Sequence, residues 1–527
     1  MAAAAALGGL AGYDVLQRRR SVLRNFPVVG HFRYLLEAFG PELRQYIVTS
    51  NNEERPFSRD QRRWIGASSE GRNNVFGFGT DDEMESVETL AIIKHSPFPA
   101  PEPKDGELGA APEYAIRCAK TLGAAHGRTH AFRPRSVVNI SGMSYGALSP
   151  VAIEALNRGA EIAGCLQNTG EGGLSPFHRS GGELVFQVGT GYFGCRGDDG
   201  RFSLEHLQES IAKGPVRAIE IKLSQGAKPG LGGLLPGRKV TPEIAACRGV
   251  EVGKDCVSPP AHSAFSDVDG LIEFVEMIAA GTGLPVGIKS AVGEGSFWRE
   301  LTERMAATGG GPDSVTIDGG EGGTGAAPLE LSDWVGLPLQ EGLILMRNAL
   351  VGCGLKDRIR LVASGKVYSG MGLARNLAMG ADWCNAARAF MFSIGCIQAQ
   401  RCHLDTCPTG VTTQNPGRQR GLIPEIQGER SARFHARTVA ALAEMAAAAG
   451  LSHPRDLQPH HLMHRVGPEA AETMDRIHPF LPENILREAP EDTLYGDWWK
   501  AAQAGSFTPA TDLVAHRATS NRRSRAS

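Results

Sequence analysis

The sequence predicts an α/β protein whose central domain is a (β/α)8 TIM barrel. Three observations support this prediction. Short apolar stretches alternate with amphipathic stretches between about residues 137 and 385. Eight such apolar stretches can be counted, a number that fits a closed barrel better than an open sheet. Most of them end in a polar or Gly-rich loop, which is where barrels of this type carry their active sites.

The eight expected strands are short and rich in apolar residues. In chain order they cover Val137–Ile140, Cys165–Asn168, Leu184–Val188, Ala218–Leu223, Pro285–Lys289, Ser314–Ile317, Ile359–Ala363 and Asp382–Asn385. Between them, amphipathic spacing predicts helices that include Pro150–Ile162, Leu204–Ala212, Asp267–Ala280 and Gly370–Met379.

Two extensions flank the predicted barrel, which we place at residues 131–420. Residues 1–130 are irregular, with a Pro-rich stretch at Pro97–Pro103, and should pack on the barrel as an N-terminal extension. Residues 421–527 should form a helical C-terminal extension followed by a disordered polar and basic tail. No repeat of solenoid length is found.

The charge balance and the cysteine content of the chain argue against nucleic-acid binding and for a cytoplasmic location. The chain has 55 basic and 57 acidic residues and a net charge of −2, which gives no electrostatic basis for binding nucleic acid. Ten cysteines without secretory spacing favour a reducing compartment, so we expect a cytoplasmic protein. The apolar first dozen residues are too short to span a bilayer, which needs about 20. Followed by Arg18–Arg20, they would also fit an end that associates with a membrane.

Three cysteines near residue 400 form the most specific metal-binding pattern. Cys396, Cys402 and Cys407 follow a C-x5-C-x4-C spacing, with a proline directly after the third. This spacing suits an iron–sulfur cluster better than the paired knuckles of structural zinc. Three nearby ligands fit a three-iron cluster, or a four-iron cluster with one outside ligand. The alternative is three buried free thiols.

The loops after the expected strands contain the other candidate site residues. Glycines in these loops would let backbone N–H groups approach a ligand, and loops after the seventh and eighth strands usually hold phosphate. The segments are 141–147, 167–173, 222–230, 318–325, Ser364-Gly365 and 386–388, and Lys289 ends the fifth strand.

Several of these stretches resemble the flavin-binding synthase domain of glutamate synthase. The matching segments are GMSYGALSP, NTGEGG, EIKLSQGAKPGLGGLLPGRKV, SPPAH, GGEGGTGAAPLELSDWVGLPLQEGL and CHLDTCPTGVTTQNP. Upstream, LRNFPVVGHFRYLLEAFGPELRQYIV resembles the free-standing FMN-binding glutamate synthase family. This resemblance implies reductive amination of 2-oxoglutarate to glutamate with FMN and an iron–sulfur cluster, most simply of the 3Fe-4S type.

The resemblance also suggests roles for individual residues. FMN would be bound by Met143, Ser144, Gln167, Lys289, Gly319, Gly320, Ser364, Gly365, Ala387 and Arg388. Catalysis would involve Lys289, Glu171 and Lys222; Lys289 would neutralise charge on the reduced flavin. The substrate carboxylates would bind Gln225, Lys228 and Arg248, with Lys222 as a further cation. The cluster ligands would be Cys396, Cys402 and Cys407. Structural roles are the alternative for the charged residues, and we expect His262 to be structural.

Departures from the family pattern refine the expected reaction. No cysteine precedes Cys118, so we expect ammonia rather than glutamine as the nitrogen source. The seventh loop reads Ser364-Gly365-Lys366 where the family has two adjacent glycines, and the eighth has Ala387-Arg388 where the family tends to have Gly-Thr. No dinucleotide-binding fingerprint stands out in the sequence, so a ferredoxin or a reductase subunit should supply the electrons. Alternatives are another amine, such as methylamine, or a non-catalytic electron-transfer subunit.

Overall fold

The computed structural model describes residues 1–47, 54–72, 77, 79–80, 84, 91–101, 116–118, 120–467, 470–496 and 499; side chains of 41–47 are not described. The tail for which the sequence predicts disorder lies outside these residues.

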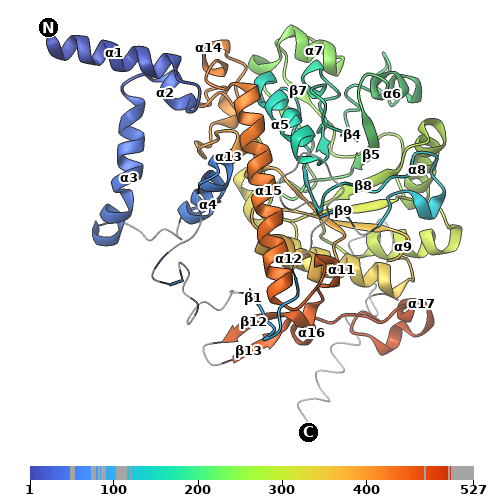
Figure 1. Ribbon diagram of the computed structural model, residues 1–527. Coiled ribbons are helices and arrows are strands. Elements are labelled where there is room, and N and C mark those ends of the chain that lie inside the picture. The colour runs from blue at the N-terminus through green and yellow to red at the C-terminus, as the bar shows by residue number, and fades with distance from the viewer. Residues whose placement is uncertain are drawn as a thin grey trace.

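Eight parallel strands close into a barrel at the centre of the molecule (Figure 1). The order around the barrel follows the chain, and β11 closes onto β2 through pairs such as Cys384 with Val138. The predicted TIM barrel is therefore confirmed. The strands are β2 (Val138–Ile140), β3 (Gln167–Asn168), β4 (Leu184–Val188), β5 (Val216–Lys222), β8 (Val286–Ser290), β9 (Ser314–Asp318), β10 (Arg360–Ser364) and β11 (Trp383–Ala386).

Helices surround the barrel in the connections between its strands. They are α5 (Pro150–Ala163), α6 (Leu204–Ile211), α7 (Pro242–Arg248), α8 (Val268–Thr282), α9 (Ser296–Thr308), α10 (Leu329–Trp334), α11 (Leu339–Gly352), α12 (Gly370–Ala378) and α13 (Arg388–Ser393). After α14 (Pro416–Gln419), the long helix α15 (Pro424–Ala448) packs between α5 and α12 (Figure 1). Helix α15 therefore belongs to the outer ring of barrel helices. The boundary predicted at residue 420 had instead placed this segment in the C-terminal extension.

Two small sheets lie outside the barrel, and the sequence prediction contains neither. Strand β1 (Ala91–Ile93) pairs antiparallel with β12 (Leu462–Gly467), which pairs with β13 (Ala470–Thr473). This sheet joins the two extensions, so the C-terminal part is not only helical; it also contains α16 (Met474–Ile477) and α17 (Ile485–Glu488). Strands β6 (Leu234–Leu235) and β7 (Cys256–Val257) pair in the long connection after β5.

The N-terminal extension begins with four helices, α1 (Ala2–Leu16), α2 (Ser21–Asn25), α3 (Gly30–Ile47) and α4 (Arg59–Glu70). α1 and α3 extend away from the barrel, whereas α4 packs on α15 (Figure 1). Buried Asp14 ties α1 to the following segment, because it accepts a hydrogen bond from Val28 N (2.8 Å) and lies 2.7 Å from His31 Nε2. None of the described helices has the length and apolarity needed to cross a bilayer.

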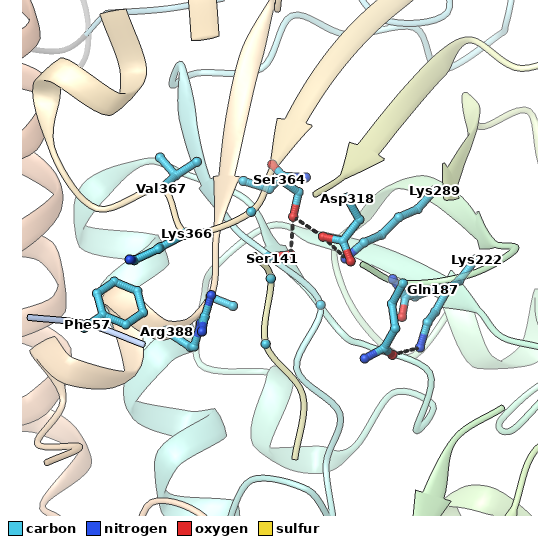
Figure 2. A pocket seen from close by; sticks show the side chains of 17 residues that line it. Phe57, Ser141, Gln187, Lys222, Lys289, Asp318, Ser364, Lys366, Val367 and Arg388 are labelled. Atoms are coloured by element: carbon cyan, nitrogen blue, oxygen red, sulfur yellow. Dashed lines mark hydrogen bonds and ion pairs between the residues drawn. The ribbon is translucent and has the colours of Figure 1, made fainter. Parts of the chain in front are cut away.

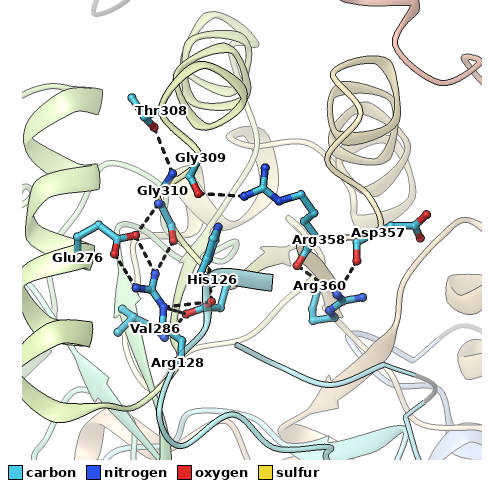
Figure 3. A network of polar contacts seen from close by, with 12 residues as sticks. His126, Arg128, Glu276, Val286, Thr308, Gly309, Gly310, Asp357, Arg358 and Arg360 are labelled. Carbon is cyan, nitrogen blue, oxygen red and sulfur yellow. Dashed lines mark hydrogen bonds and ion pairs between the residues drawn. The ribbon is translucent and has the colours of Figure 1, made fainter. Parts of the chain in front are cut away.

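The two ends of the barrel differ. The carboxyl ends of the strands surround a polar pocket (Figure 2). At the opposite end, a network of polar contacts attaches the N-terminal extension to the barrel (Figure 3). Arg128 contacts Glu276 through both Nη atoms (2.5 and 2.8 Å) and Asp313 through Nε (3.1 Å). His126 Nδ1 lies 2.8 Å from Asp313, which also accepts a hydrogen bond from Val286 N.

Replacing Arg128 with alanine should destabilise the protein substantially. Its side chain is only 8% exposed and that of Asp313 only 1%, so the substitution leaves a buried carboxylate without its principal cation. Breaking a buried pair in this way typically costs 3–5 kcal/mol; we expect about 3 because Glu276 is partly exposed. Urea unfolding followed by circular dichroism measures the change.

The matched control is Arg304, which forms a similar two-point contact with Asp269 between α9 and α8. Both side chains are about half exposed, so Arg304→Ala should leave the unfolding midpoint almost unchanged. Equal losses in the two variants would contradict the importance assigned to burial.

Buried histidines predict a loss of stability in mild acid. Burial lowers the pKa of His178 to about 3 and the pKa of His435 to about 4. A group with a depressed folded-state pKa binds protons first in the unfolded chain, so its stabilisation is complete above pH 6.5 and declines toward pH 4. Each histidine should contribute a slope of ~1.4 kcal/mol per pH unit within this window. Chemical denaturation at a series of pH values should show a shallower slope for His435→Gln; an unchanged slope would contradict the assignment.

Candidate functional site

The pocket at the carboxyl end of the barrel contains cations at two separate places (Figure 2). Lys366 and Arg388 lie on one side with Phe57, whereas Lys222 and Lys289 lie on the other with Gln187. The lining residues come from seven of the barrel strands or the loops that follow them, and from the N-terminal extension. They are Phe57, Ser141, Gly142, Gln187, Lys222, Gln225, Lys289, Asp318, Gly322, Gly323, Ser364, Gly365, Lys366, Val367, Asn385, Ala387 and Arg388.

Lys289 is held as a buried cation at the end of β8. Its Nζ lies 3.5 Å from Oδ1 of Asp318, and the residue is only 6% exposed. Burial alone would lower its pKa, but the carboxylates of Asp318 and Glu220 outweigh burial and raise the pKa above its ordinary value. The ammonium is therefore the stable form at neutral pH, as its predicted role requires.

Asp318 and Glu220 are themselves fixed by hydrogen bonds. Asp318 accepts one from Gly226 N and one from the Ser364 hydroxyl, both at 2.8 Å. Glu220, inside the barrel, accepts bonds from the Asn168 and Gln187 amides and the Thr316 hydroxyl at 2.7–3.0 Å. These two carboxylates, to which the sequence analysis assigns no role, orient Lys289 and balance its charge.

A second group of charges lies around Glu171. Its Oε2 is 3.2 Å from Lys222 Nζ, which also donates to Gln225 Oε1 at 2.6 Å. Burial raises the pKa of Glu171, but Lys222, Arg248 and Lys228 outweigh burial and lower it. Three cations thus surround one ionised carboxylate, leaving a surplus of positive charge suited to an acidic substrate.

Lys228 and Arg248 belong to this group but do not line the pocket. Lys228 Nζ donates to Ala326 O (3.1 Å), and Arg248 Nη2 donates to Tyr145 O (2.8 Å). Both residues are about 95% buried. The structure therefore places them behind the pocket wall, where their charges act on Glu171.

The cations on the Phe57 side of the pocket, Lys366 and Arg388, come from the two loops that depart from the family pattern. Lys366 Nζ lies 5.4 Å and Arg388 Cζ 4.8 Å from the centre of the Phe57 ring. Burial, then the neighbouring Arg388, lowers the pKa of Lys366; burial lowers that of Arg388 to about 10. Among the described residues neither forms an ion pair with a carboxylate. An anion between them would relieve both desolvation and mutual repulsion.

Phe57 links this end of the pocket to the cysteine loop. Its backbone N–H donates to Gln398 Oε1 (3.1 Å), and its carbonyl accepts from Gln398 Nε2 (3.0 Å). Its ring is 1% exposed and packs edge-on against Phe392. The N-terminal extension therefore forms part of the pocket wall.

The predicted cofactor residues are only partly brought together. Ser364, Gly365, Ala387, Arg388 and Lys289 line the pocket, but five others do not. The side chain of Gln167 instead accepts a hydrogen bond from Asn157 on α5. The N–H groups of Gly319 and Gly320 donate to Ser364 O and Leu337 O. Met143 and Ser144 are not among the lining residues; Gly170 (φ 65°) packs so closely against Ser144 that a Cβ would lie 2.5 Å from its backbone N.

The sequence reasoning missed several lining residues. They are Phe57, Gln187, Lys366, Val367 and Asn385; Ser141, Gly142, Asp318, Gly322 and Gly323 lie in the expected loops but had no role assigned to them. Lys366 carried a usable signal, because it is a cation directly after the seventh-strand glycine. His262 has the structural geometry expected of it: it is 2.9 Å from Lys222 O and stacks on Phe265, and burial lowers its pKa to about 4.

Cys396, Cys402 and Cys407 lie in one compact loop after α13 and influence one another's ionisation. Burial, then the other two sulfurs, raises the pKa of Cys396 to about 12. Burial would also raise the pKa of Cys407, but hydrogen bonds from Thr409 and Thr412 outweigh it and lower the pKa. No three His, Cys, Asp or Glu side chains among the described residues are close enough to hold a single metal ion. A cluster of several irons spaces its thiolates more widely than one ion does.

Comparisons with known proteins identify the family. The conserved region of glutamate synthase matches residues 119–452. Glutamate synthase large subunit-like protein YerD of Bacillus subtilis is 36% identical over 86% of this chain and 91% of its own length. Archaeal-type glutamate synthase [NADPH] of Thermotoga maritima is 35% identical and archaeal glutamate synthase [NADPH] of Methanocaldococcus jannaschii 34% identical, over 56% and 60% of this chain. The chain spans only 55% and 59% of their lengths.

Among solved structures, a mandelate oxidase variant with (S)-mandelic acid aligns at 16% identity and a TM-score of 0.42, covering 73% of this chain and 86% of that one. This structural similarity is too low to support an argument about function. The family match covers the barrel, the cysteine loop and every lining residue of the pocket except Phe57, and the chain belongs to the glutamate synthase family of oxidoreductases.

Proposed function

We propose that this protein reductively aminates 2-oxoglutarate to glutamate, using FMN, an iron–sulfur cluster and free ammonia. The observation that supports this function best is that one pocket contains two cationic groups at opposite ends. A cationic end, formed by Lys366 and Arg388, pairs with no carboxylate among the described residues and faces a second cationic group around Lys289 and Lys222. This arrangement suits a cofactor with a phosphate at one end and a ring that becomes anionic at the other.

The residues present fit FMN in their chemistry. Lys366, Arg388 and the N–H of Gly365 would hold the phosphate, and Lys289 would face the ring. When bound, FMN would supply the hydride that reduces the imine. Lys289 needs no rearrangement to act, because Asp318 and Glu220 already hold its charge in place.

The acidic substrate would be bound beside Glu171. Lys222, Lys228 and Arg248 supply positive charge, and Gln225 supplies an amide at the pocket wall. Because Glu171 is ionised, it is suited to accept a proton during imine formation rather than to start as the acid. The bond to Lys222 would have to loosen when a substrate carboxylate competes for that ammonium.

The three cysteines would hold the cluster, and the 3Fe-4S type needs no further ligand. A cluster in this loop would pass single electrons from a ferredoxin or a reductase subunit toward the pocket. Ammonia is proposed as the nitrogen source, because formation of an imine at the keto group of 2-oxoglutarate needs only a free amine.

Turnover by the reconstituted holoprotein tests this proposal. Acid-released cofactor should be FMN, iron should be present at about three atoms per chain, and glutamate should form from 2-oxoglutarate and ammonium with a reduced one-electron carrier. Glutamine should not replace ammonium. Formation of N-methylglutamate from methylamine alone would favour the other amine. No turnover with any small amine, despite bound flavin and a reducible cluster, would favour an electron-transfer subunit.

A further inference from the structure

A buried lysine lies between the loop after β2 and the cysteine loop. The ammonium of Lys239 donates to three backbone carbonyl oxygens: Ala147 at 2.8 Å, Thr412 at 2.9 Å and Cys402 at 3.2 Å. The residue is 2% exposed. Its three protons are thus all used, and two of the three bonds go to the loop that contains the proposed cluster ligands.

The charge on Lys239 is not neutralised by a close carboxylate. Within the described parts of the chain it forms no ion pair; Asp405 influences it only from farther away. Lysine is rarely so buried without a counter-charge, because transfer of an ammonium from water is costly. Burial lowers the pKa of Lys239 to about 8, which still leaves the ammonium as the main form at neutral pH, so a net positive charge lies within the wall shared by the two loops.

Neutral hydrogen bonds already join the same two loops. Ser149 N donates to Val411 O at 2.9 Å, and Gln414 Nε2 donates to Gly146 O and Leu148 O at 3.0 and 3.1 Å. Similar neutral donors could have supplied the bonds that Lys239 makes. What the lysine adds is charge, placed against the backbone of a cluster ligand.

We propose that Lys239 is a positioning residue whose fixed positive charge raises the reduction potential of the cluster held by the cysteine loop. This inference rests on the proposed cluster. Reduction adds negative charge to a cluster already bound by three thiolates, and a nearby buried cation favours that form. Lys239 would thus help the cluster accept an electron from a carrier of modest reducing strength.

A redox titration of the holoprotein, followed by EPR, tests the proposal. Lys239→Met removes the charge and the donors, whereas Lys239→Gln removes the charge but keeps an amide donor. Both should lower the midpoint potential of the cluster at unchanged iron content. Lys254→Met is the matched control, because Lys254 also lies between β5 and β8 but is 70% exposed. The cluster of this variant should have the same midpoint potential as that of the parent protein.

The outcomes separate charge from structure. An unchanged potential in both neutral variants overturns the proposal, and so does a fall in Lys239→Met alone, which would assign a hydrogen-bonding role. If neither neutral variant keeps iron, the midpoint potential is measured in Lys239→Arg, which retains the charge. A potential equal to that of the parent supports the role of charge, and a lowered potential overturns it. A parent protein without iron overturns the cluster proposal and this inference together, whereas iron with unchanged potentials overturns this inference alone.

Discussion

Replacing Lys289 with methionine is expected to lower the turnover number for glutamate formation by roughly 10²–10³-fold, the usual cost of losing one preorganised group that stabilises developing charge. Its ammonium is held by Asp318 at the end of the neighbouring strand, and its charge is needed mainly when the flavin becomes anionic. The loss should therefore appear in kcat more than in the KM for 2-oxoglutarate.

Controls distinguish catalysis from folding in this experiment. Lys289→Arg keeps a cation beside Asp318 and should recover part of the rate. The single variant could unfold because it leaves the Asp318 carboxylate unpaired. In that case the double variant Lys289→Met/Asp318→Asn, which removes both charges, is measured instead. Parental turnover by a folded Lys289→Met protein with full flavin would remove Lys289 from the mechanism.

Replacing Cys407 with alanine should abolish turnover driven by a one-electron carrier and reduce the iron content sharply. Hydrogen bonds from Thr409 and Thr412 favour the thiolate of Cys407, the form that binds iron. Iron analysis, EPR and carrier-dependent turnover measure the effect. A small chemical reductant should still reduce the flavin that remains bound, because that route does not need the cluster.

The matched control is Cys353→Ala. Cys353 is also buried, at 1% exposed, but it follows α11 and lies outside the cysteine loop. Its loss should cost some stability through a small cavity but leave the iron content unchanged. Parental iron content in Cys407→Ala, or a parent that binds one zinc and no iron, would contradict the proposed ligand set.

The sequence was sufficient to predict the barrel and the end at which the pocket lies. Each strand has its own apolar signal, and in a barrel the loops after the strands meet at one end whatever their sequence. It was not sufficient to decide which side chains of a strand face inward. Both faces of a barrel strand are buried, so hydrophobicity carries no alternation. Gln167 was therefore predicted to bind the cofactor, yet its side chain bonds to α5, and Gln187 lines the pocket instead.

Contacts between distant segments were also beyond sequence reasoning. Nothing near Phe57 indicates that it will lie over Lys366 and Arg388, because their contact depends on how the N-terminal extension packs. The β1–β12–β13 sheet joins segments more than 350 residues apart, through short strands with mostly part-exposed residues. The cysteine loop was easier to predict because all its candidate ligands lie within one short segment.

The pairing of Phe57 with Gln398 would make retention of the two proposed cofactors interdependent. Gln398 lies two residues after Cys396, so a loop that loses its metal would also lose the rigidity that holds Phe57 against the cationic end of the pocket. Depletion of iron should then accelerate the escape of FMN, and maturation of the protein would be most efficient when the cluster is inserted before the flavin. Measuring flavin release before and after iron chelation would reveal this order of assembly.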